Sequence, residues 1–461
     1  MDTPPAFRLL ERLYADPDMR RIWSEDETVR TWLRVEAELA HAQARAGVLD
    51  AVDADAVAGA CLEDLVDAEA LWEAGRVVGY PILGLVRQVA AALPPGPDGR
   101  VHFGATTQDI MDTALSLQLA AACDRLGELA AGVADALAVL VREHRGTVMA
   151  ARTHGQQAVP TTFGAKVAVY LDQFVDRIER LRACRRDVAV VSLFGAGGTN
   201  AAMGPQGSAV RAGLAQGLGL ATTDVPWHAA RQRVVDFGLL CSTLAGICVR
   251  LAREVVDLSR NEIAEVGERG GHLRGASSTM PQKTNPISSE SVVGFGIAAQ
   301  IEGAGLLRAL ESEHERSSGE WQLEWLLVPQ VAEHTAGALA LTADLVRTLV
   351  VRPEQMARNL EVDGALLMSE ALMMRLAAGL GRERAHDLVY RAALEARSDG
   401  ADLVGAAHRL LAAEGLEGLA DAAFTPGDYL GETDRVCDAA LARWASVSTS
   451  SSLVDVQGGA R

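Results

Sequence analysis

Aromatic side chains and lysine are scarce in this 461-residue chain. Aromatic residues make up only 4% of it, whereas hydrophobic residues make up 49%. Alanine and leucine, which dominate, favour helices, whereas sheets favour aromatic and β-branched residues. The composition therefore predicts an all-α fold. Lysine occurs only at Lys166 and Lys283, among 43 basic residues.

Acidic residues outnumber basic ones in the chain, and we expect neither paired cysteines nor a leader. Its formal net charge of −18 argues against nucleic acid and anionic membranes as partners, but not against a small anionic substrate held by local arginines. The six cysteines show no C-x-x-C pair and no zinc spacing, so we expect free thiols and no metal site. No signal peptide is recognisable, and no apolar run reaches the roughly 18 residues of a membrane span. We expect a soluble, cytoplasmic protein.

The length and the helix pattern predict several domains. A chain of 461 residues exceeds one ordinary core. Segments 162–186, 233–266 and 287–310 carry apolar residues on more than one helical face, so each must be buried on several sides. This predicts a central helical bundle extended by other subunits. We expect an N-terminal helical domain (1–112), the bundle (113–352), a C-terminal helical domain (353–445) and a Ser- and Gly-rich tail (446–461).

The first polar break precedes a helix that we expect to end near residue 145. Thr106, Thr107 and Gln108 stand directly before Asp109. Two threonines followed by an acid are typical of a helix cap. A helix N-terminus with hydroxyl and amide side chains is equally suited to bind a carboxylate. Both interpretations remain open from the residues alone.

The second polar break surrounds His154. It contains Thr153, His154, Gly155 and Gln156, and Pro160 closes it. A lone histidine is more often structural than catalytic, but this one lies in a polar group outside the helices. Its ordinary pKa lies near neutral pH, which suits a general acid.

The third break, residues 270–286, is the longest interruption in the helical region. Three glycines and two prolines exclude a regular helix through it. It carries Ser277, Ser278, Lys283 and Asn285, which supply hydroxyl, cationic and amide groups. A lysine on such a loop is suited to reach an anion.

The segment Ser277-Ser278-Thr279-Met280-Pro281-Gln282-Lys283-Thr284-Asn285-Pro286 resembles the signature loop of the fumarase/aspartase superfamily. The resemblance covers roughly residues 8–445 and implies a homotetramer of helical subunits, with each active site built from three subunits and no cofactor. It implies that Ser277 is the base that removes a Cβ proton, that His154 acts as or positions a general acid, and that Glu290 pairs with the histidine. The substrate-binding residues that it implies are Thr106, Thr107, Gln108, Thr153, Gln156, Ser278, Lys283 and Asn285. Tyr80 and one or more of Arg231, Arg233 and Arg316 are implied toward the distal group of the substrate, and the choice among the three arginines stays open.

The resemblance is closest to the branch of adenylosuccinate lyase and 3-carboxy-cis,cis-muconate cycloisomerase. Leu13 precedes Tyr14 where adenylosuccinate lyases have an arginine, and no His-Asp pair precedes the first motif, so adenylosuccinate itself is disfavoured. The preferred hypothesis is a lyase that releases fumarate from a small N-substituted succinate, of the amino- or nitrosuccinate type. The alternatives are the cycloisomerase and a catalytically silent relative, as among lens crystallins. Intact Ser277, Lys283 and His154 disfavour the silent relative.

Overall fold

The fold is almost entirely helical. The computed structural model describes residues 8–363, 366–399, 402–416 and 425–449. Within them, the sheet consists of two antiparallel pairs, β1 (Val148–Thr153) with β2 (Gln156–Thr162), and β3 (Val266–Gly267) with β4 (Val350–Val351). The predicted all-α class is confirmed. Short 3-10 turns also occur, at Glu63–Leu65, Pro97–Arg100, Ala201–Gln206, Leu307–Glu311, Leu366–Met368 and Pro426–Asp428.

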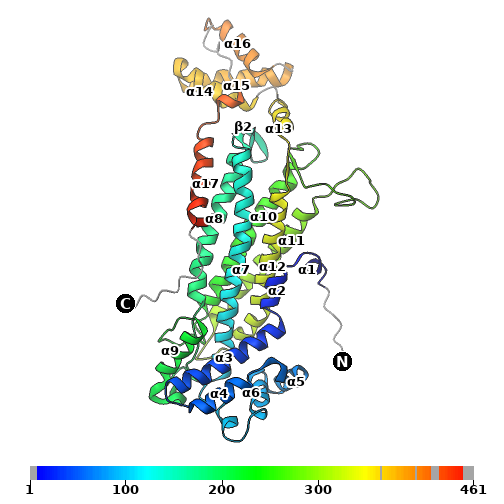
Figure 1. Cartoon of the computed structure of the whole chain (residues 1–461). Coiled ribbons are helices and arrows are strands. Elements are labelled where there is room, and N and C mark those ends of the chain that lie inside the picture. Colours follow the sequence, from blue (N-terminus) through cyan, green and yellow to red (C-terminus); the bar gives the residue numbers. More distant parts are fainter. Residues whose placement is uncertain (1–7, 364–365, 400–401, 417–424, 450–461) are drawn as a thin grey trace.

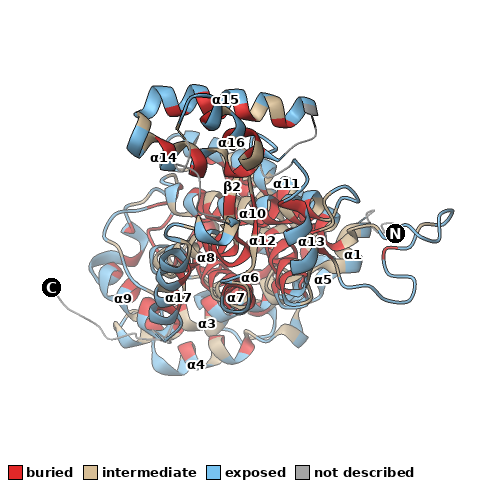
Figure 2. Ribbon diagram, turned by 90° about the horizontal axis from the view of Figure 1, so that it is seen from above, coloured by how far each residue is buried: buried red, intermediate tan, exposed pale blue. Residues whose placement is uncertain are grey.

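Five long helices form the central bundle (Figure 1). They are α7 (Thr107–Glu143), α8 (Phe163–Val188), α10 (Gln232–Leu258), α11 (Ile287–Leu306) and α12 (Glu320–Arg347). Their facing sides bury a continuous core that includes Leu126, Phe174, Phe237 and Phe295. Seen along the bundle, the buried residues lie where these helices face each other (Figure 2). At 1.5 Å per residue, the 37 residues of α7 span about 55 Å.

A second core lies at the N-terminal end of α7. It joins α3 (Glu25–Arg45), α4 (Ala51–Ala60), α5 (Ala68–Val78) and α6 (Ile82–Ala91) to residues 191–218, which include α9 (Gly207–Leu218). A Cβ atom on Gly213 would lie only 3.3 Å from the Cβ of Ala42, so the glycine allows α9 to pack closely on α3. Residues 191–218, which the sequence placed in the central domain, thus share their core with the N-terminal helices. The short helices α1 (Leu9–Tyr14) and α2 (Pro17–Ile22) pack on the central bundle instead.

A third core lies at the other end of the bundle, in α14 (Ser369–Leu380), α15 (Arg382–Asp399) and α16 (Leu403–Ala413). The helix α13 (Pro353–Asn359) connects the bundle to it (Figure 1). The final helix, α17 (Thr433–Thr449), returns to pack on α8, where Arg443 pairs with Asp172 at 2.6 Å.

The prediction that a tail begins at residue 446 is therefore wrong. Residues 446–449 continue α17, because Val447 is buried and the hydroxyl of Thr449 donates to the carbonyl of Ala445 at 2.9 Å. Placing 433–445 in the C-terminal domain was also wrong, since this part of the chain packs on the central bundle. The rest of the expected tail lies outside the described residues.

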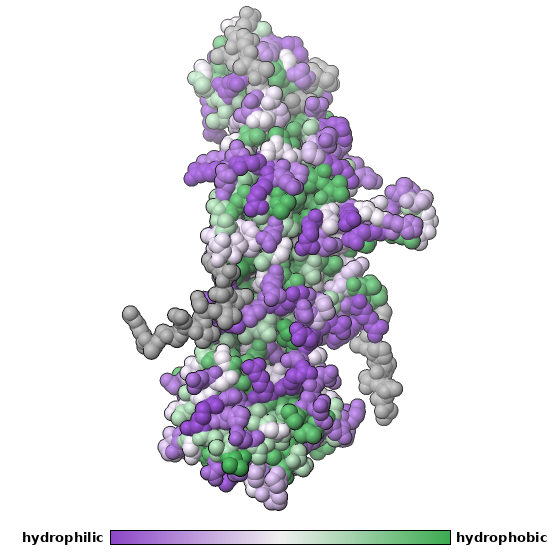
Figure 3. Space-filling view, in the orientation of Figure 1, coloured by the Kyte–Doolittle hydropathy of each residue, from purple (hydrophilic) through white to green (hydrophobic). Residues whose placement is uncertain are grey.

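Two bundle helices are more apolar than the sequence analysis recognised. The helix α10 and residues 287–311 are long and apolar enough to cross a membrane, contrary to the expectation that no run would qualify. Both are core helices of the bundle, and 56% of the most apolar part of α10 is buried within this chain. Apolar residues remain exposed on several bundle helices, namely Val139, Val169, Ile297, Ile301 and Leu326. Figure 3 shows hydrophobic surface along the middle of the molecule.

Candidate active site

The first predicted group assembles at the N-terminus of α7. Thr106 is the N-cap residue, and its backbone N–H donates to the carboxylate of Asp109 at 3.0 Å, so the helix-cap interpretation is correct. Arg316, from the loop before α12, donates to Oγ1 of Thr106 at 3.1 Å and to Oε1 of Gln108 at 3.0 Å. Thr107 is half-buried at the first helical position. A guanidinium at the positive end of a long helix is suited to bind an anion, and we call this group the candidate anion site.

Asp109 holds this end of α7 in place, and the sequence analysis did not assign it a role at the site. Its buried carboxylate accepts hydrogen bonds from the backbone N–H groups of Phe194 and Gly195, both at 2.9 Å, and lies 2.8 Å from Nε2 of His228. These bonds attach the glycine-rich turn after residue 194 to the anion site. The signal was present in the sequence, because an acid three residues after a threonine N-cap is typical of a capping box.

His102 is a second residue that the sequence analysis missed. It lies four residues before Thr106, in the left-handed conformation with φ of 59°. Its Nδ1 lies 2.6 Å from Oε1 of Glu36, which is buried. Burial disfavours the imidazolium, but the charge and hydrogen bond of Glu36 outweigh it and raise the pKa of His102. The raised pKa favours the imidazolium form, paired with Glu36, four residues before the cap of α7.

Arg231 is not available to bind substrate, contrary to the sequence prediction. Its side chain is fully buried, and its guanidinium donates to both carboxylate oxygens of Asp112 and of Glu324 and to the carbonyl of Trp227. All five N–H groups therefore have partners. Burial raises the pKa of Glu324, and the nearby charge of Arg231 offsets only part of this increase. Burial by itself would lower the pKa of Arg231, but the two paired carboxylates outweigh this effect and raise it. This arginine joins α7, α10 and α12.

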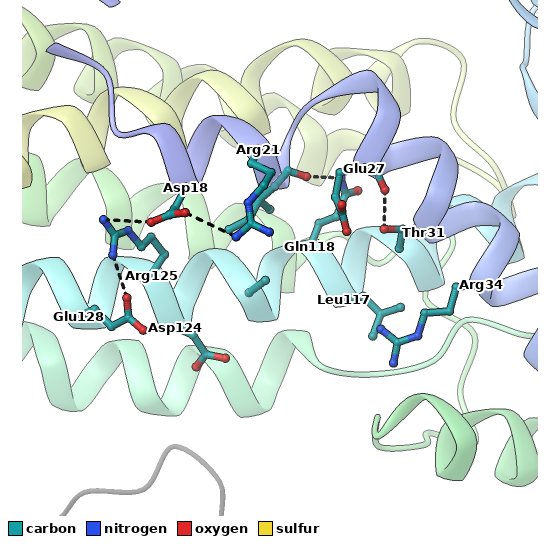
Figure 4. Close-up of a pocket in the computed structure, with 12 residues that line it drawn as sticks. Asp18, Arg21, Glu27, Thr31, Arg34, Leu117, Gln118, Asp124, Arg125 and Glu128 are labelled. Atoms are coloured by element: carbon teal, nitrogen blue, oxygen red, sulfur yellow. Dashed lines mark hydrogen bonds and ion pairs between the residues drawn. The ribbon is translucent and has the colours of Figure 1, made fainter. Parts of the chain in front are cut away.

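Arg233 also lies away from the anion site. It lines a surface cavity of 340 Å³ between α8 and α10, together with Arg177, Arg180 and Asp236. Another cavity, of 490 Å³, lies between α2, α3 and α7 and is lined by side chains of both charges, including Arg21, Arg34 and Asp124 (Figure 4). This second cavity contains none of the predicted site residues.

Tyr80, which the sequence predicted to bind substrate, packs beside two tryptophans of α12. Its ring centroid is 5.8 Å from that of Trp321 and 6.3 Å from that of Trp325. The indole N–H of Trp321 donates to Asp112 at 3.3 Å, one turn along α7 from Gln108. The three rings thus form an aromatic wall beside the first turns of α7 and α12.

The second predicted group lies at the tip of the β1–β2 hairpin. Thr153 pairs with Gln156, and His154 and Gly155 between them have φ of 52° and 77°. Two consecutive positive φ values are typical of a type I′ hairpin turn. The sequence predicted only an irregular break here. All four side-chain positions, 153–156, are exposed, so the turn presents His154 to the exterior of this chain.

The third predicted group lies on the loop between β3 and α11. Oγ of Ser277 accepts hydrogen bonds from the backbone N–H groups of Thr279, at 3.2 Å, and Met280, at 3.1 Å. Asn285 closes the loop, since its side-chain amide donates to the carbonyl of Gly275 at 3.0 Å. Ser278 and Lys283 are exposed on the loop.

Within one chain the three groups lie far apart. The anion site is at one end of α7, and the hairpin follows the other end, about 55 Å away by the length of the helix. The loop projects from the side of the bundle (Figure 1). Glu290, on the first turn of α11, is exposed. Among the described residues, no three His, Cys, Asp or Glu side chains are arranged to hold a metal ion.

Comparisons with known proteins agree with the fold and the motifs. A family model described as "Lyase" matches residues 14–303, and one described as "Adenylosuccinate lyase C-terminus" matches residues 365–440. The chain is 36% identical to 3-carboxy-cis,cis-muconate cycloisomerase of Pseudomonas aeruginosa, over 96% of this chain and 97% of the relative. It is 35% identical to trans-aconitate decarboxylase 1 of Mycosarcoma maydis, over 95% and 89%. The crystal structure of a fumarate lyase from Mesorhizobium sp. BNC1 superposes with a TM-score of 0.85 at 33% identity, covering 95% of this chain and all of that one.

Fold, motifs and relatives together define an enzyme of the lyase family. The chain belongs to the fumarase/aspartase superfamily, in the branch that contains adenylosuccinate lyase and the carboxymuconate cycloisomerases.

Proposed function

We propose that the enzyme catalyses anti β-elimination from a small N-substituted succinate, of the amino- or nitrosuccinate type, and releases fumarate. The observation that carries this proposal is the environment of Ser277. Its Oγ accepts two backbone N–H hydrogen bonds on an exposed loop. Two such donors favour a negatively charged oxygen over a neutral hydroxyl, as a serine that acts as a base requires.

Removal of the Cβ proton leaves negative charge on the adjacent carboxylate. Lys283, six residues after Ser277, is the cation that we assign to this charge, with the amide of Asn285 two residues further on. Donors aimed at developing charge are effective only where water is excluded, so the loop must close over the substrate. We assign binding of the other carboxylate to Thr106, Gln108 and Arg316, which are hydrogen-bonded to one another at the N-terminus of α7.

His154, oriented by Glu290, is proposed to protonate the leaving group. The turn that carries it, from Thr153 to Gln156, would also contact the substrate. Both His154 and Glu290 are exposed in the single chain and can therefore face another subunit.

The enzyme is proposed to work as a homotetramer with active sites shared between subunits. Two features support this assembly. The anion site and the hairpin lie about 55 Å apart along α7, too far to act on one small substrate within a chain. Exposed apolar side chains on α7, α8, α11 and α12 provide surface for further helix packing. No cofactor is required by this proposal, and a cytoplasmic location remains a prediction.

A nitrogen leaving group is favoured by the Thr-His element and by the match of residues 365–440 to the adenylosuccinate lyase C-terminus. The second candidate is 3-carboxy-cis,cis-muconate cycloisomerase. The Pseudomonas aeruginosa relative, which aligns over nearly the whole of both chains, favours it. The two reactions run in opposite directions. In the elimination Ser277 would remove the proton next to a carboxylate, whereas in lactone formation a carboxylate oxygen adds to the double bond and a proton is delivered to the neighbouring carbon, so the same proton-transfer and anion-binding residues can serve either reaction.

Product analysis separates the two reactions. The purified enzyme is incubated with aspartate, nitrosuccinate, other N-substituted succinates and 3-carboxy-cis,cis-muconate, and fumarate and lactone are quantified by chromatography. We expect fumarate from at least one substituted succinate. Lactone without fumarate would establish the second candidate and contradict the first.

The proposed base is tested with the variant Ser277→Ala, and Ser278→Ala is its matched control. The first removes the proposed base, and the second removes its exposed neighbour, which lacks the two N–H donors. We expect Ser277→Ala to lose at least roughly 10² in kcat, comparable to losing one donor to developing charge, and Ser278→Ala to lose much less. Full turnover by Ser277→Ala would refute the assignment of the base.

A further inference from the structure

A buried carboxylate connects the histidine hairpin to the root of the loop that carries Ser277. Glu265, directly before β3, is fully buried and forms a bidentate ion pair with Arg152, at 2.9 and 2.7 Å. Arg152 immediately precedes the turn that presents His154. The neighbouring Ala264 has φ of 53°, so the backbone here adopts a conformation that a non-glycine residue rarely uses.

The opposite strand of the hairpin is held at the same place. Gln157 is the cross-strand partner of Arg152, and its side-chain amide donates to the carbonyl of Asn359 at 2.8 Å. The side-chain amide of Asn359 in turn donates to Glu265 and to the carbonyl of Ile263, both at 2.8 Å. Arg152 and Gln157 form the cross-strand pair next to the final pair, Thr153 with Gln156, and both are therefore bound to one cluster one residue away from the His154 turn.

Three residues after Glu265, the carboxylate of Glu268 joins the two ends of the loop that carries Ser277. Glu268 accepts from the backbone N–H groups of Ser288, at 3.1 Å, and Ser289, at 2.8 Å, and from the Ser289 hydroxyl at 2.8 Å. These bonds tie the start of the loop to the first turn of α11, where an acid also complements the helix dipole. Residues 265–268 thus contact the hairpin on one side and both ends of the loop on the other.

We propose that Glu265 is a positioning residue that holds the His154 turn and the root of the Ser277 loop in one fixed relation. A two-stranded hairpin is only marginally stable by itself, so the place of its tip depends on what clamps its strands. The bidentate pair supplies a directional clamp, and the Glu265 carboxylate in it is fully buried. The catalytic roles of His154 and Ser277 rest on the function proposed above, whereas the clamp rests on the contacts alone.

Residues 265–268 connect two elements that belong to different active sites of the proposed tetramer. In the proposed tetramer, His154 and Ser277 of one chain serve different active sites. Residues 265–268 then form a direct physical connection between two sites, and loosening Glu265 disturbs both elements at once.

Hydrogen exchange followed by mass spectrometry tests the clamp without any substrate. Glu265→Gln is compared with Glu268→Gln and with Arg443→Met, which breaks an ion pair between α17 and α8 far from both elements. We expect Glu265→Gln to speed exchange in peptides 148–162 and 262–287. Glu268→Gln should affect only the second peptide and Arg443→Met neither. Faster exchange of Glu265→Gln in the hairpin alone, or evenly over the whole chain, would overturn the proposal.

Kinetics distinguish positioning from a purely structural ion pair. A 1 Å displacement of a catalytic group costs roughly 10²-fold, so kcat of Glu265→Gln should fall by about that factor while KM changes little. The double variant Arg152→Gln with Glu265→Gln leaves no unpaired buried charge and should regain thermal stability but not kcat. Recovery of both together would show a purely structural role.

A milder variant covers the case in which Glu265→Gln does not fold. Arg152→Lys keeps the charge but loses the bidentate geometry, and should show the same exchange pattern at smaller amplitude. An unchanged exchange pattern in this variant would overturn the clamp. Full turnover by Ser277→Ala would instead refute the proposed function and leave the exchange result intact, so the two failures are distinguishable.

Discussion

Replacement of Arg231 by methionine should destabilise the enzyme without changing the way it binds substrate. Methionine fills part of the space of the arginine but leaves Asp112 and Glu324 facing each other without their common cation. Removing one partner from a buried ion pair typically costs about 3–5 kcal/mol. The pKa of Glu324 is already raised by burial, so this carboxyl group is the one expected to take up a proton in the variant. Once Glu324 is protonated, only the Asp112 carboxylate remains charged and unpaired, so the loss of stability stays within about 3–5 kcal/mol instead of counting two unpaired carboxylates.

The cost is large against a typical domain stability of about 5–15 kcal/mol. It can be measured by urea unfolding followed through tryptophan fluorescence. All variants must be compared at one protein concentration, because the stability of an oligomer depends on it. Arg316→Met is the matched control, since this arginine is only half-buried and contacts Thr106 and Gln108 at the anion site. We expect it to retain stability and to raise KM by roughly tenfold or more, as the loss of a hydrogen bond to a charged group of about 1.5–3 kcal/mol implies.

The opposite pattern would refute this reasoning. If Arg231→Met kept its unfolding midpoint and raised KM, the arginine would be a substrate ligand, as the sequence first indicated. A triple variant in which Asp112→Asn and Glu324→Gln accompany Arg231→Met offers an internal check. It removes both unpaired carboxylates and should recover most of the lost stability.

Two further predictions concern the cap of α7 and the base of the loop. The pKa of His102 is raised in the folded state by Glu36, so the stability from this pair is fully present below the unfolded pKa of about 6.5 and is lost as pH rises through the folded pKa. The melting temperature of the wild type should therefore be higher than that of Glu36→Gln, and this difference should be larger at pH 6 than at pH 9. An equal difference at the two pH values would contradict the pairing of His102 with Glu36. Gly275 has φ of 68°, and a Cβ atom there would lie 2.5 Å from the carbonyl oxygen of Asn285. Gly275→Ala should lower kcat/KM, because relieving this clash moves the loop that carries Ser277. Wild-type kinetics would show that this end of the loop has no role in the reaction.

The helical architecture could be predicted because long apolar helices leave a strong periodic signal. The irregular loop at 270–286 was equally predictable, since glycine and proline exclude a helix whatever the surroundings. The hairpin at 148–162 was missed because its turn consists of His154 and Gly155. Asparagine or aspartate usually stands where this histidine does, so the turn lacks the customary signal.

The role of Arg231 could not be predicted from its neighbours in sequence. The carboxylates that neutralise it lie 119 and 93 residues away, on other helices. The clamp around Glu265 was hidden for the same reason, because Arg152 and Asn359 meet it from 113 and 94 residues away. Local sequence shows which side chains are charged, but only the fold determines whether a charge meets a partner or a ligand.

The central claim, that His154 and Ser277 from different chains complete one active site, is tested most directly by mixing two inactive variants. His154→Ala and Ser277→Ala are unfolded together in equal amounts, refolded, and assayed against either variant refolded alone. If the two residues of a site come from different chains, random assembly gives about one quarter of sites with both intact, and the mixture should regain about a quarter of wild-type activity. If both residues of a site come from one chain, the mixture will remain as inactive as its components, and that result would contradict the account.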